Sequence, residues 1–436
     1  MSEELSQVLR ARREKLVALQ ERGIEPFAYR FERTHDSGAA KVRFEEQEGT
    51  GELPEDGHGE HVRTGGRIVS WRSHGKSAFA HVEDGVGRIQ LYFKKNVLGE
   101  ESFGDLDLLD LGDWIGVEGP LFRTRTGEVT VRVDDWELLS KSLRPLPMGK
   151  VEVDPETGER TVHSGFQDQE SRYRQRYADL AVHPEVREVF RTRSRVISGI
   201  RRFLDAEGFL EVETPALQPL YGGAAARPFV TTHNALDQTM YLRIADELYL
   251  KRLIVGGFER VYEIAKDFRN EGLSRFHNPE FTMLEFYQAF ADYSDMMELV
   301  ERLLLRLVEE VHGSNTLTFQ GQEIAFRPGF PRLSLMEALG DALGADPAGL
   351  PEEDLRARAE ALSIPELDGA GRGKLYDKLF GELVQPGLVQ PTFVVDYPVE
   401  LSPLAKLHRE RPGLTERFEL FIAGQEIANA FSELND

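Results

Sequence analysis

Apolar and polar residues alternate along two stretches of the chain, between residues 260 and 287, that flank a short charged segment. A repeat of two is the period of a half-buried β-strand, so we predict two strands joined by a loop. One face of the second strand carries two aromatic rings, a thioether and a carboxylate: Phe281, Met283, Glu285 and Tyr287. Such a face suits a pocket that stacks a flat ring and binds a cation, and an ordinary hairpin is the alternative.

Charged side chains gather in the loop between these strands, which contains Arg269, Glu271, Arg275 and His277. Two guanidinium groups in one loop can hold a phosphate, because each presents a planar fork of N–H donors. Charged residues are also common at the solvated tips of hairpins, so the loop alone leaves both interpretations open.

Elsewhere the apolar residues recur at the three- and four-residue spacing of amphipathic helices. By contrast, residues 33–61 are poor in large apolar side chains and rich in Gly, Glu and Asp, which predicts a weakly ordered connector. The predicted helical segments are residues 3–22, 185–207 and 293–312, together with a small helical insertion at about 332–375.

Five short strand-like runs with Gly-rich turns fill residues 62–139, a pattern typical of a small OB-type β-barrel. OB barrels often bind single-stranded nucleic acid by stacking bases on aromatic rings. Phe79 and Gln90 lie on adjacent runs and Arg72 comes just before them, so an aromatic ring, an amide and a guanidinium group would form a minimal base reader. The alternative for Phe79 is an ordinary place in the barrel core.

A chain of 436 residues is too long for one core and predicts two or three domains. It has no cysteine, which excludes disulfides and thiolate zinc sites, and its 11 histidines include no metal-binding pair of the HExxH kind. The sequence contains no apolar run long enough to span a bilayer and no signal peptide at its N-terminus, so we expect a cytoplasmic protein without membrane contact.

The net charge of −22 argues against general coating of nucleic acid, although it permits a specific RNA partner at local basic patches. One candidate patch lies in the first helix, where four basic residues are close together. A solvated helix face is an equally good interpretation of them. These residues are Arg10, Arg12, Arg13 and Lys15.

The sequence FRNEG, followed by HNPEFTMLEFY, resembles motif 2 of the class II aminoacyl-tRNA synthetases, specifically the lysyl enzymes. The helix, strand and proline unit that ends at Pro215 resembles motif 1, which builds the subunit interface in that family and implies a homodimer. The resemblance implies an α+β fold. An N-terminal OB-type β-barrel would be followed by a class II catalytic domain, whose mixed, mainly antiparallel sheet is flanked by helices.

With this resemblance the chain divides into four parts. They are 1–61, an N-terminal helix and flexible connector; 62–143, an OB-fold anticodon-binding domain; 144–180, a linker with a charged insertion; and 181–436, a catalytic domain that is C-terminally incomplete.

The resemblance implies ligation of L-lysine to tRNA(Lys) through a lysyl-adenylate made from ATP. Arg269 is our candidate catalytic residue, because a guanidinium group can bind the substrate carboxylate and the α-phosphate together. Magnesium on the phosphates needs a few carboxylate oxygens, for which Glu419 and Glu426 are the candidates. The expected ATP-binding residues are Arg269, Glu271, His277 and Phe281.

The resemblance also implies a lysine pocket in which carboxylates and a phenol meet the two ammonium groups of the substrate. The expected lysine-binding residues are Gly223, Glu247, Glu285, Tyr287, Asn429, Phe431 and Glu433, and the expected anticodon-binding residues are Arg72, Phe79, Gln90 and Glu128. Positions 429, 431 and 433 share one face of a strand, whereas Glu426 is out of phase with them. Either a bulge intervenes or Glu426 faces elsewhere.

Class II synthetases carry a third motif, with an arginine that covers the adenine, and the sequence stops at Asp436 before any such segment. A sequence cut short, a non-catalytic paralogue and a substitute elsewhere in the chain are the three explanations. A non-catalytic binder of lysine or tRNA is therefore the alternative function. An aspartate or asparagine ligase is a further alternative, although Glu433 would repel an aspartate side chain.

Overall fold

The structure is a computed structural model of the chain that describes residues 3–153, 160–163, 165–274 and 276–435. These residues form two compact units, Met1–Glu188 and Val189–Asp436, each with its own hydrophobic core. Among the described residues no helix combines the length and the apolar character that a membrane crossing requires.

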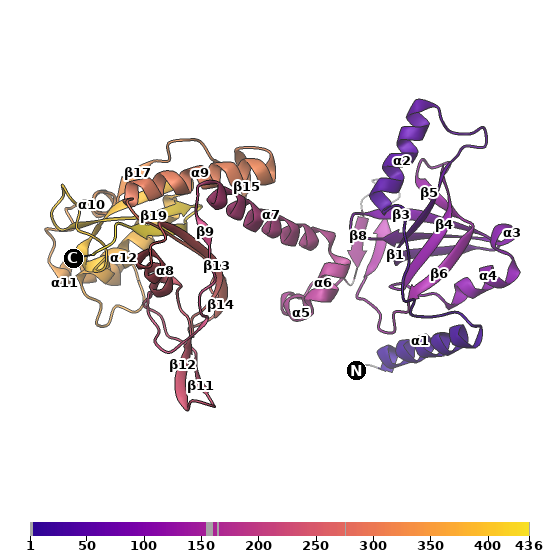
Figure 1. Cartoon of the computed structure of the whole chain (residues 1–436), viewed down its shortest axis with the longest axis horizontal. Coiled ribbons are helices and arrows are strands. Elements are labelled where there is room, and N and C mark those ends of the chain that lie inside the picture. Colours follow the sequence, from indigo (N-terminus) through magenta and orange to yellow (C-terminus); the bar gives the residue numbers. More distant parts are fainter. Residues whose placement is uncertain (1–2, 154–159, 164, 275, 436) are drawn as a thin grey trace. The chain divides into compact units, whose positions relative to one another are not determined.

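The first unit is built around a closed β-barrel (Figure 1). Its strands are β1 (His58–His74), β2 (Ser77–Glu83), β3 (Arg88–Lys94), β4 (Trp114–Arg123), β5 (Val129–Val133) and β6 (Asp135–Ser140). The order β1-β2-β3-β5-β4 returns to β1, because β1 pairs with both β2 and β4, and β6 adds to the outer side of β4. The predicted five-stranded barrel is therefore confirmed.

Alternation along the barrel strands supplies the core. On β1 the side chains of Val62, Thr64 and Ile68 are buried, and these positions are two and four residues apart, so they share one face of the strand. Between β3 and β4 the chain makes helices α3 (Lys95–Leu98) and α4 (Glu100–Asp105) and a short 3₁₀ turn.

We predicted a weakly ordered connector at residues 33–61, and this prediction is wrong, because helix α2 (Ser37–Thr50) lies there. The carboxylate of Asp36 caps the helix by accepting the N–H of Ala39 at 2.8 Å, and Gly51 ends it in the left-handed conformation. The ring of Phe44, on this helix, packs in the barrel core and is only 1% exposed. Only one large apolar residue of this helix is buried. The helix therefore lacks the repeated apolar positions from which a sequence-based prediction could be made.

Helix α1 (Glu3–Glu21) confirms the first predicted helix, but its four basic residues do not form one patch. Arg12 is 8% exposed and donates hydrogen bonds to the backbone carbonyls of Ser142 and Leu111, at 2.6 and 2.9 Å. Lys15 donates to Asp110 at 2.9 Å. Arg12 and Lys15 therefore attach the helix to the barrel.

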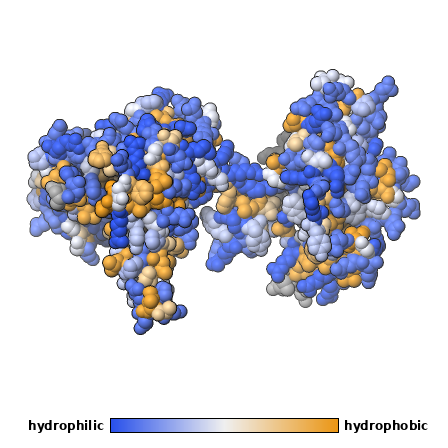
Figure 2. Space-filling model, viewed as in Figure 1, coloured by the Kyte–Doolittle hydropathy of each residue, from blue (hydrophilic) through white to orange (hydrophobic). Residues whose placement is uncertain are grey.

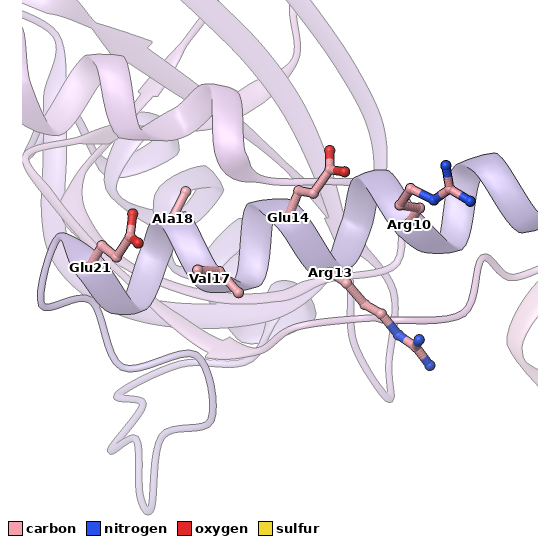
Figure 3. A pocket seen from close by; sticks show the side chains of 6 residues that line it. All are labelled: Arg10, Arg13, Glu14, Val17, Ala18 and Glu21. Atoms are coloured by element: carbon pink, nitrogen blue, oxygen red, sulfur yellow. The ribbon is translucent and has the colours of Figure 1, made fainter.

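The outer side of α1 borders a shallow hollow of about 350 Å³ (Figure 3). Every residue that lines it belongs to this one helix, so it is an open surface rather than a binding cleft. The lining residues are Arg10, Arg13, Glu14, Val17, Ala18 and Glu21.

Short elements follow the barrel. The stretch that we predicted as a charged insertion contains a two-stranded hairpin whose strands pair antiparallel. These elements are β7 (Lys150–Val153), β8 (Arg160–His163), α5 (Gln169–Arg174) and α6 (Arg176–Val182). Helix α7 (Pro184–Ala206) comes next and confirms the helix predicted at 185–207.

Two sheets organise the second unit. The first has the order β14-β13-β9 and the second β17-β18-β19-β20. Their strands are β9 (Leu210–Glu211), β13 (Arg260–Phe268), β14 (Glu280–Gln288), β17 (Arg332–Ser334), β18 (Thr392–Pro398), β19 (Leu414–Ile422) and β20 (Gln425–Phe431). Only β9 with β13 and β17 with β18 run parallel in these two sheets, so the mixed, mainly antiparallel prediction is confirmed.

Helix α9 (Tyr293–His312) confirms the third predicted helix and packs on the second unit's core. It begins with a capping box, in which Asp292 and Asp295 each accept a backbone N–H from the other. Its buried side chains contact the large aromatic residues of the sheets, so one core supports both sheets.

The predicted helical insertion is present and reaches a little further along the chain than expected. It consists of α10 (Leu335–Leu343), α11 (Glu352–Ala361) and α12 (Arg372–Leu383), which share a small core around Leu339, Leu355 and Leu379.

The second unit also carries two small β structures. One is a three-stranded sheet of β10 (Leu217–Gln218), β11 (Val230–His233) and β12 (Gln238–Leu242), in which β11 and β12 project as a hairpin (Figure 1). The other is a hairpin of β15 (Thr316–Phe319) and β16 (Gln322–Ala325).

Candidate functional site

The site in the second unit is built on the β13–β14 hairpin that the alternating pattern predicted. The strands pair antiparallel, with Phe281 opposite Asp267 and Glu285 opposite Glu263. The hydroxyl of Tyr287 donates to Oε2 of Glu285 at 3.1 Å, so these two residues share a face as expected.

The carboxylate of Glu285 is held from two sides. The backbone N–H of Asp246 donates to its Oε1 at 3.2 Å, and Tyr287 donates to its other oxygen. Burial raises the pKa of Glu285 to about 7, despite these two hydrogen bonds. Burial also raises the pKa of Tyr287, and the negative charges of Glu285, Glu247 and Glu433 add to the rise.

Glu247 lies in the first turn of helix α8 (Glu247–Val255), beside Gly223. Gly223 has a φ of +87°, and a Cβ there would lie 2.9 Å from Cβ of Glu247 and 3.4 Å from its Oε2. Only glycine combines this backbone conformation with so close an approach. The two residues expected to bind the α-ammonium group are therefore in contact.

Glu433 is joined to this group by a residue that our sequence analysis missed. Lys251 lies one turn after Glu247 on α8, and its Nζ is 2.5 Å from Oε1 of Glu247 and 2.8 Å from Oε1 of Glu433. The same Nζ lies 5.9 Å from the ring centroid of Phe431. The spacing of Glu247 and Lys251 on one helix face was a signal for the first contact, whereas no sequence pattern pointed to the contact between Lys251 and Glu433.

A β-bulge determines on which face of β20 the side chain of Glu426 lies. Leu420 pairs with Ala428 and Phe421 pairs with Glu426, which leaves Ile427 as an extra residue in β20. Glu426 thereby joins the face of Asn429, whose amide donates to Glu419 at 3.3 Å and to Glu426 at 3.4 Å.

Glu419 and Glu426 fit the binding of a divalent cation. Burial and the neighbouring charge of Glu426 raise the pKa of Glu419 to about 7, so a cation between them would relieve a repulsion. Their oxygens are the hard ligands that Mg²⁺ prefers. Arg417 already contacts Glu419 at 2.5 Å, which leaves Glu426 as the more exposed of the two.

The residues expected at ATP lie at one end of the hairpin. The guanidinium group of Arg269 covers the ring of Phe281, 5.1 Å from its centroid, and its Nε donates to the carbonyl of Ile244 at 3.3 Å. Glu271 and His277 are exposed in the loop, and Arg275 lies outside the described residues. The hairpin thus brings Arg269 and Phe281 together, whereas Glu271 and His277 are exposed in the loop, where the ring of His277 is hydrogen-bonded to Ser274.

A buried cluster of charged side chains, centred on Arg243, lies next to this site. Arg243 lies 3.0 Å from Asp246, 2.9 Å from Glu263 and 3.5 Å from Asp267, and all four are at most 5% exposed. Its N–H groups donate to Glu263 and to backbone carbonyls. Burial, followed by the charge of Asp267, raises the pKa of Asp246 to about 8.

Carboxylate oxygens of Asp246, Asp267 and Glu285 lie within 4.8 Å of one another, the kind of grouping that can hold a metal ion. Arg243 already supplies a positive charge beside the two aspartates. We therefore interpret this cluster as a structural support, because its backbone and side chains position Glu285 and the start of α8.

The barrel of the first unit presents a second surface. Phe79 stacks on Tyr92 with ring centroids 4.6 Å apart, and Arg72 is the partner of Phe79 across β1 and β2. Phe122 lies 6.0 Å from Tyr92 and His58 lies 5.8 Å from Phe122, so the aromatic rings continue across four strands. Sequence analysis identified only the first ring of this row.

The side chains of Gln90 and Glu128 contact each other in the same barrel. The amide nitrogen of Gln90 donates to Glu128 at 2.9 Å, and the hydroxyl of Thr130 donates to the Gln90 oxygen at 2.9 Å. His81, also missed by the sequence analysis, hydrogen-bonds the second oxygen of Glu128 at 2.8 Å. A ligand that binds the Gln90 amide must therefore replace these internal hydrogen bonds.

Comparison with known proteins matches both units. A family profile described as tRNA synthetases class II (D, K and N) matches residues 168–436, and one described as an OB-fold nucleic acid binding domain matches residues 62–139. A lysine–tRNA ligase of Pelotomaculum thermopropionicum is 52% identical over all of this chain and 82% of its own length. Those of Carboxydothermus hydrogenoformans and Christiangramia forsetii are 50% and 49% identical over all of this chain, and over 84% and 74% of their own lengths.

The raised pKa of Asp246 leads to a prediction about stability. Between its ordinary pKa and about 8, the folded state keeps a proton that the unfolded state has lost, so stability falls as the pH rises through this range. Asp246→Asn stays neutral throughout. We expect the free energy of unfolding of the variant, relative to the wild type, to increase by at least about 1 kcal/mol between pH 5 and pH 8.

Calorimetry at the two pH values measures this difference. All three tryptophans, Trp71, Trp114 and Trp136, lie in the first unit, so tryptophan fluorescence identifies the transition of that unit and leaves the other to be analysed. Asp341→Asn, at an exposed position of α10, serves as the control. A difference that does not change with pH would show that Asp246 is ionised in the folded state.

Proposed function

The chain belongs to the lysine–tRNA ligase family of class II tRNA synthetases, and on that premise we propose that it joins L-lysine to tRNA(Lys) through a lysyl-adenylate. One observation carries the proposal. The carboxylates of Glu247 and Glu433 lie 2.5 and 2.8 Å from one ammonium group, that of Lys251, and the carboxylate of Glu285 accepts a hydrogen bond from Tyr287. A ligand with two ammonium groups and one carboxylate matches this set of charges.

In the proposed complex, Glu247 and Glu285 bind the α-ammonium group, with Gly223 beside them. Glu433 and Tyr287 bind the ε-ammonium group, and Asn429 and Phe431 complete the wall of the pocket. Burying an ammonium group is costly unless charged partners replace its water, and this pocket supplies them at both ends. The carboxylate of Glu433 would repel an aspartate side chain, which favours lysine over the related substrates of the family.

The proposed first step joins two anions. An oxygen of the lysine carboxylate attacks the α-phosphorus of ATP, the bond to the pyrophosphate oxygen breaks, and pyrophosphate leaves. Arg269 binds the attacking carboxylate and the α-phosphate together, while Phe281 stacks the adenine and Glu271 and His277 contact the nucleotide. The attacking carboxylate is already ionised at neutral pH, so this step needs no general base.

A divalent cation fits this site. Glu419 and Glu426 would hold Mg²⁺, which supplies positive charge to the phosphates when it is bound. In the second step a hydroxyl at the 3′ end of tRNA(Lys) takes the lysyl group from the adenylate and AMP leaves. Because this reaction uses tRNA and ATP, we place the chain in the cytoplasm.

The anticodon is the proposed ligand of the barrel. Phe79 offers a ring for stacking one base, Gln90 and Glu128 offer polar groups for its edge, and Arg72 is exposed beside them for a phosphate. The rings of Tyr92 and Phe122 extend the platform to neighbouring bases.

Lysine-dependent exchange of labelled pyrophosphate into ATP, without tRNA, tests the adenylation step in this chain. We expect exchange with lysine and none with aspartate or asparagine. Glu285→Gln keeps the size of the side chain but removes its charge. It should lower kcat/KM for lysine by roughly 10- to 100-fold, because a hydrogen bond to a charged group contributes about 1.5–3 kcal/mol.

Glu353→Gln, at an exposed position of α11, is the matched control and should leave exchange unchanged. Binding of lysine without exchange would support the non-catalytic alternative. Exchange that depends on aspartate or asparagine would contradict the lysine pocket.

Removing the stacking ring tests the barrel separately from the adenylation site. Phe79→Ala should weaken tRNA(Lys) binding by roughly 5- to 100-fold, since base stacking on an aromatic ring contributes about 1–3 kcal/mol. Pyrophosphate exchange should not change, because it requires no tRNA. Val86→Ala, at an exposed loop of the same barrel, is the control. Equal tRNA affinity in the two variants would remove Phe79 from the interface.

A homodimer is the proposed assembly. Apolar residues are exposed on α7, on β9 and on the β11–β12 hairpin, and Figure 2 shows apolar surface on the projecting hairpin. Val189, Leu210, Val230 and Leu236 are each at least 45% exposed. Apolar surface of this kind marks protein interfaces. We expect sedimentation velocity to give the mass of two chains, and a monomer at micromolar concentration would contradict the proposal.

A further inference from the structure

Lys251 makes the contacts that a substrate ammonium group would make. Its Nζ lies 2.5 Å from Glu247 and 2.8 Å from Glu433, and faces the ring of Phe431 at 5.9 Å. Glu247 and Glu433 are the residues that we assign to the two ends of the ligand. A side chain of the protein therefore already satisfies part of the pocket.

The ammonium group of Lys251 is charged. Burial alone would lower the pKa of Lys251, but the hydrogen bonds to Glu247 and Glu433 outweigh this effect and raise it. With only acceptors around it, this ammonium group has the environment that Lys and a lysine ligand both require.

We propose that Lys251 is an internal competitor of the substrate, which occupies the ammonium site of the empty pocket and is displaced when lysine binds. This inference rests on the function proposed above and goes beyond it, because it assigns a specificity role to a residue outside the expected site.

Two features make displacement physically reasonable. A bound lysine brings two ammonium groups to the same carboxylates, and a third cation on those oxygens would be repelled by both. The Lys251 side chain is 28% exposed, and its flexible stem gives the ammonium group a path into solvent. The bond between Tyr287 and Glu285 can stay in place, because Lys251 does not take part in it.

Displacement sets a threshold for binding. While the pocket is empty, Lys251 offsets the charge of Glu247 and Glu433, which would otherwise attract any small cation. A ligand binds only if its own contacts exceed those that Lys251 loses. A ligand with ammonium groups at both ends gains most here, whereas a monoamine replaces Lys251 without further benefit.

Lys251→Met tests the competition, because methionine has a similar stem without the charge. In pyrophosphate exchange we expect the KM for lysine to fall about tenfold in this variant, with kcat changed by less than about twofold. The affinity for monoamines such as butylamine should rise as well. Lys251→Arg keeps a cation and should keep a KM near that of the wild type.

Lys374→Met, at an exposed position of α12, is the control for loss of a lysine elsewhere in the unit. A KM in Lys251→Met that is unchanged or higher than in the wild type would overturn the inference, since Lys251 would then be a fixed bridge between the two carboxylates. A wild-type chain that neither binds lysine nor exchanges pyrophosphate with it would overturn the proposed function, and the inference with it.

Amine labelling followed by mass spectrometry reports the movement directly and does not depend on turnover. An acylating reagent should modify Lys251 faster when lysine saturates the pocket than when it is absent. The rate is divided by that of Lys374 in the same sample, because free lysine also consumes reagent. Labelling of Lys251 that stays equal or decreases with lysine would overturn the displacement.

Discussion

The site in the second unit depends on how an excess of buried negative charge is balanced. Asp246, Glu263 and Asp267 lie in the interior around the guanidinium group of Arg243, and Glu285 accepts a hydrogen bond from the backbone N–H of Asp246. Burial disfavours the charged forms of Glu285 and Asp246 and thereby raises the pKa values of these two groups. Such an environment favours a cationic ligand, and one cation of the chain, Lys251, already lies between Glu247 and Glu433.

The scaffold brings this charge together from distant parts of the chain. The start of α8 supplies Glu247 and Lys251, β14 supplies Glu285 and Tyr287, and the segment after β20 supplies Glu433. Lys251 joins two of these segments across 182 residues of sequence. Glu247 and Glu433 therefore both contact the ammonium group of Lys251. Under the proposed function, each of them binds a different ammonium group of the substrate.

In the barrel, the polar groups that we propose as base readers are hydrogen-bonded to one another. Gln90 is 6% exposed and bonded to Glu128 and Thr130, so its amide is satisfied before any base arrives. The rings of Phe79 and Tyr92 need no such partner and remain partly exposed. Stacking can therefore begin before the hydrogen bonds are exchanged.

The sequence by itself determined the β13–β14 hairpin, the face shared by Glu285 and Tyr287, and the barrel, because alternation with a period of two is a local property of the chain. It also pointed to the family through one contiguous motif. Helix α2 escaped prediction because its burial depends on one ring, Phe44. Only the tertiary structure decided the phase of Glu426, through the bulge at Ile427, and the placement of Lys251 between Glu247 and Glu433. Both depend on contacts between segments whose separation in sequence carries no periodic signal.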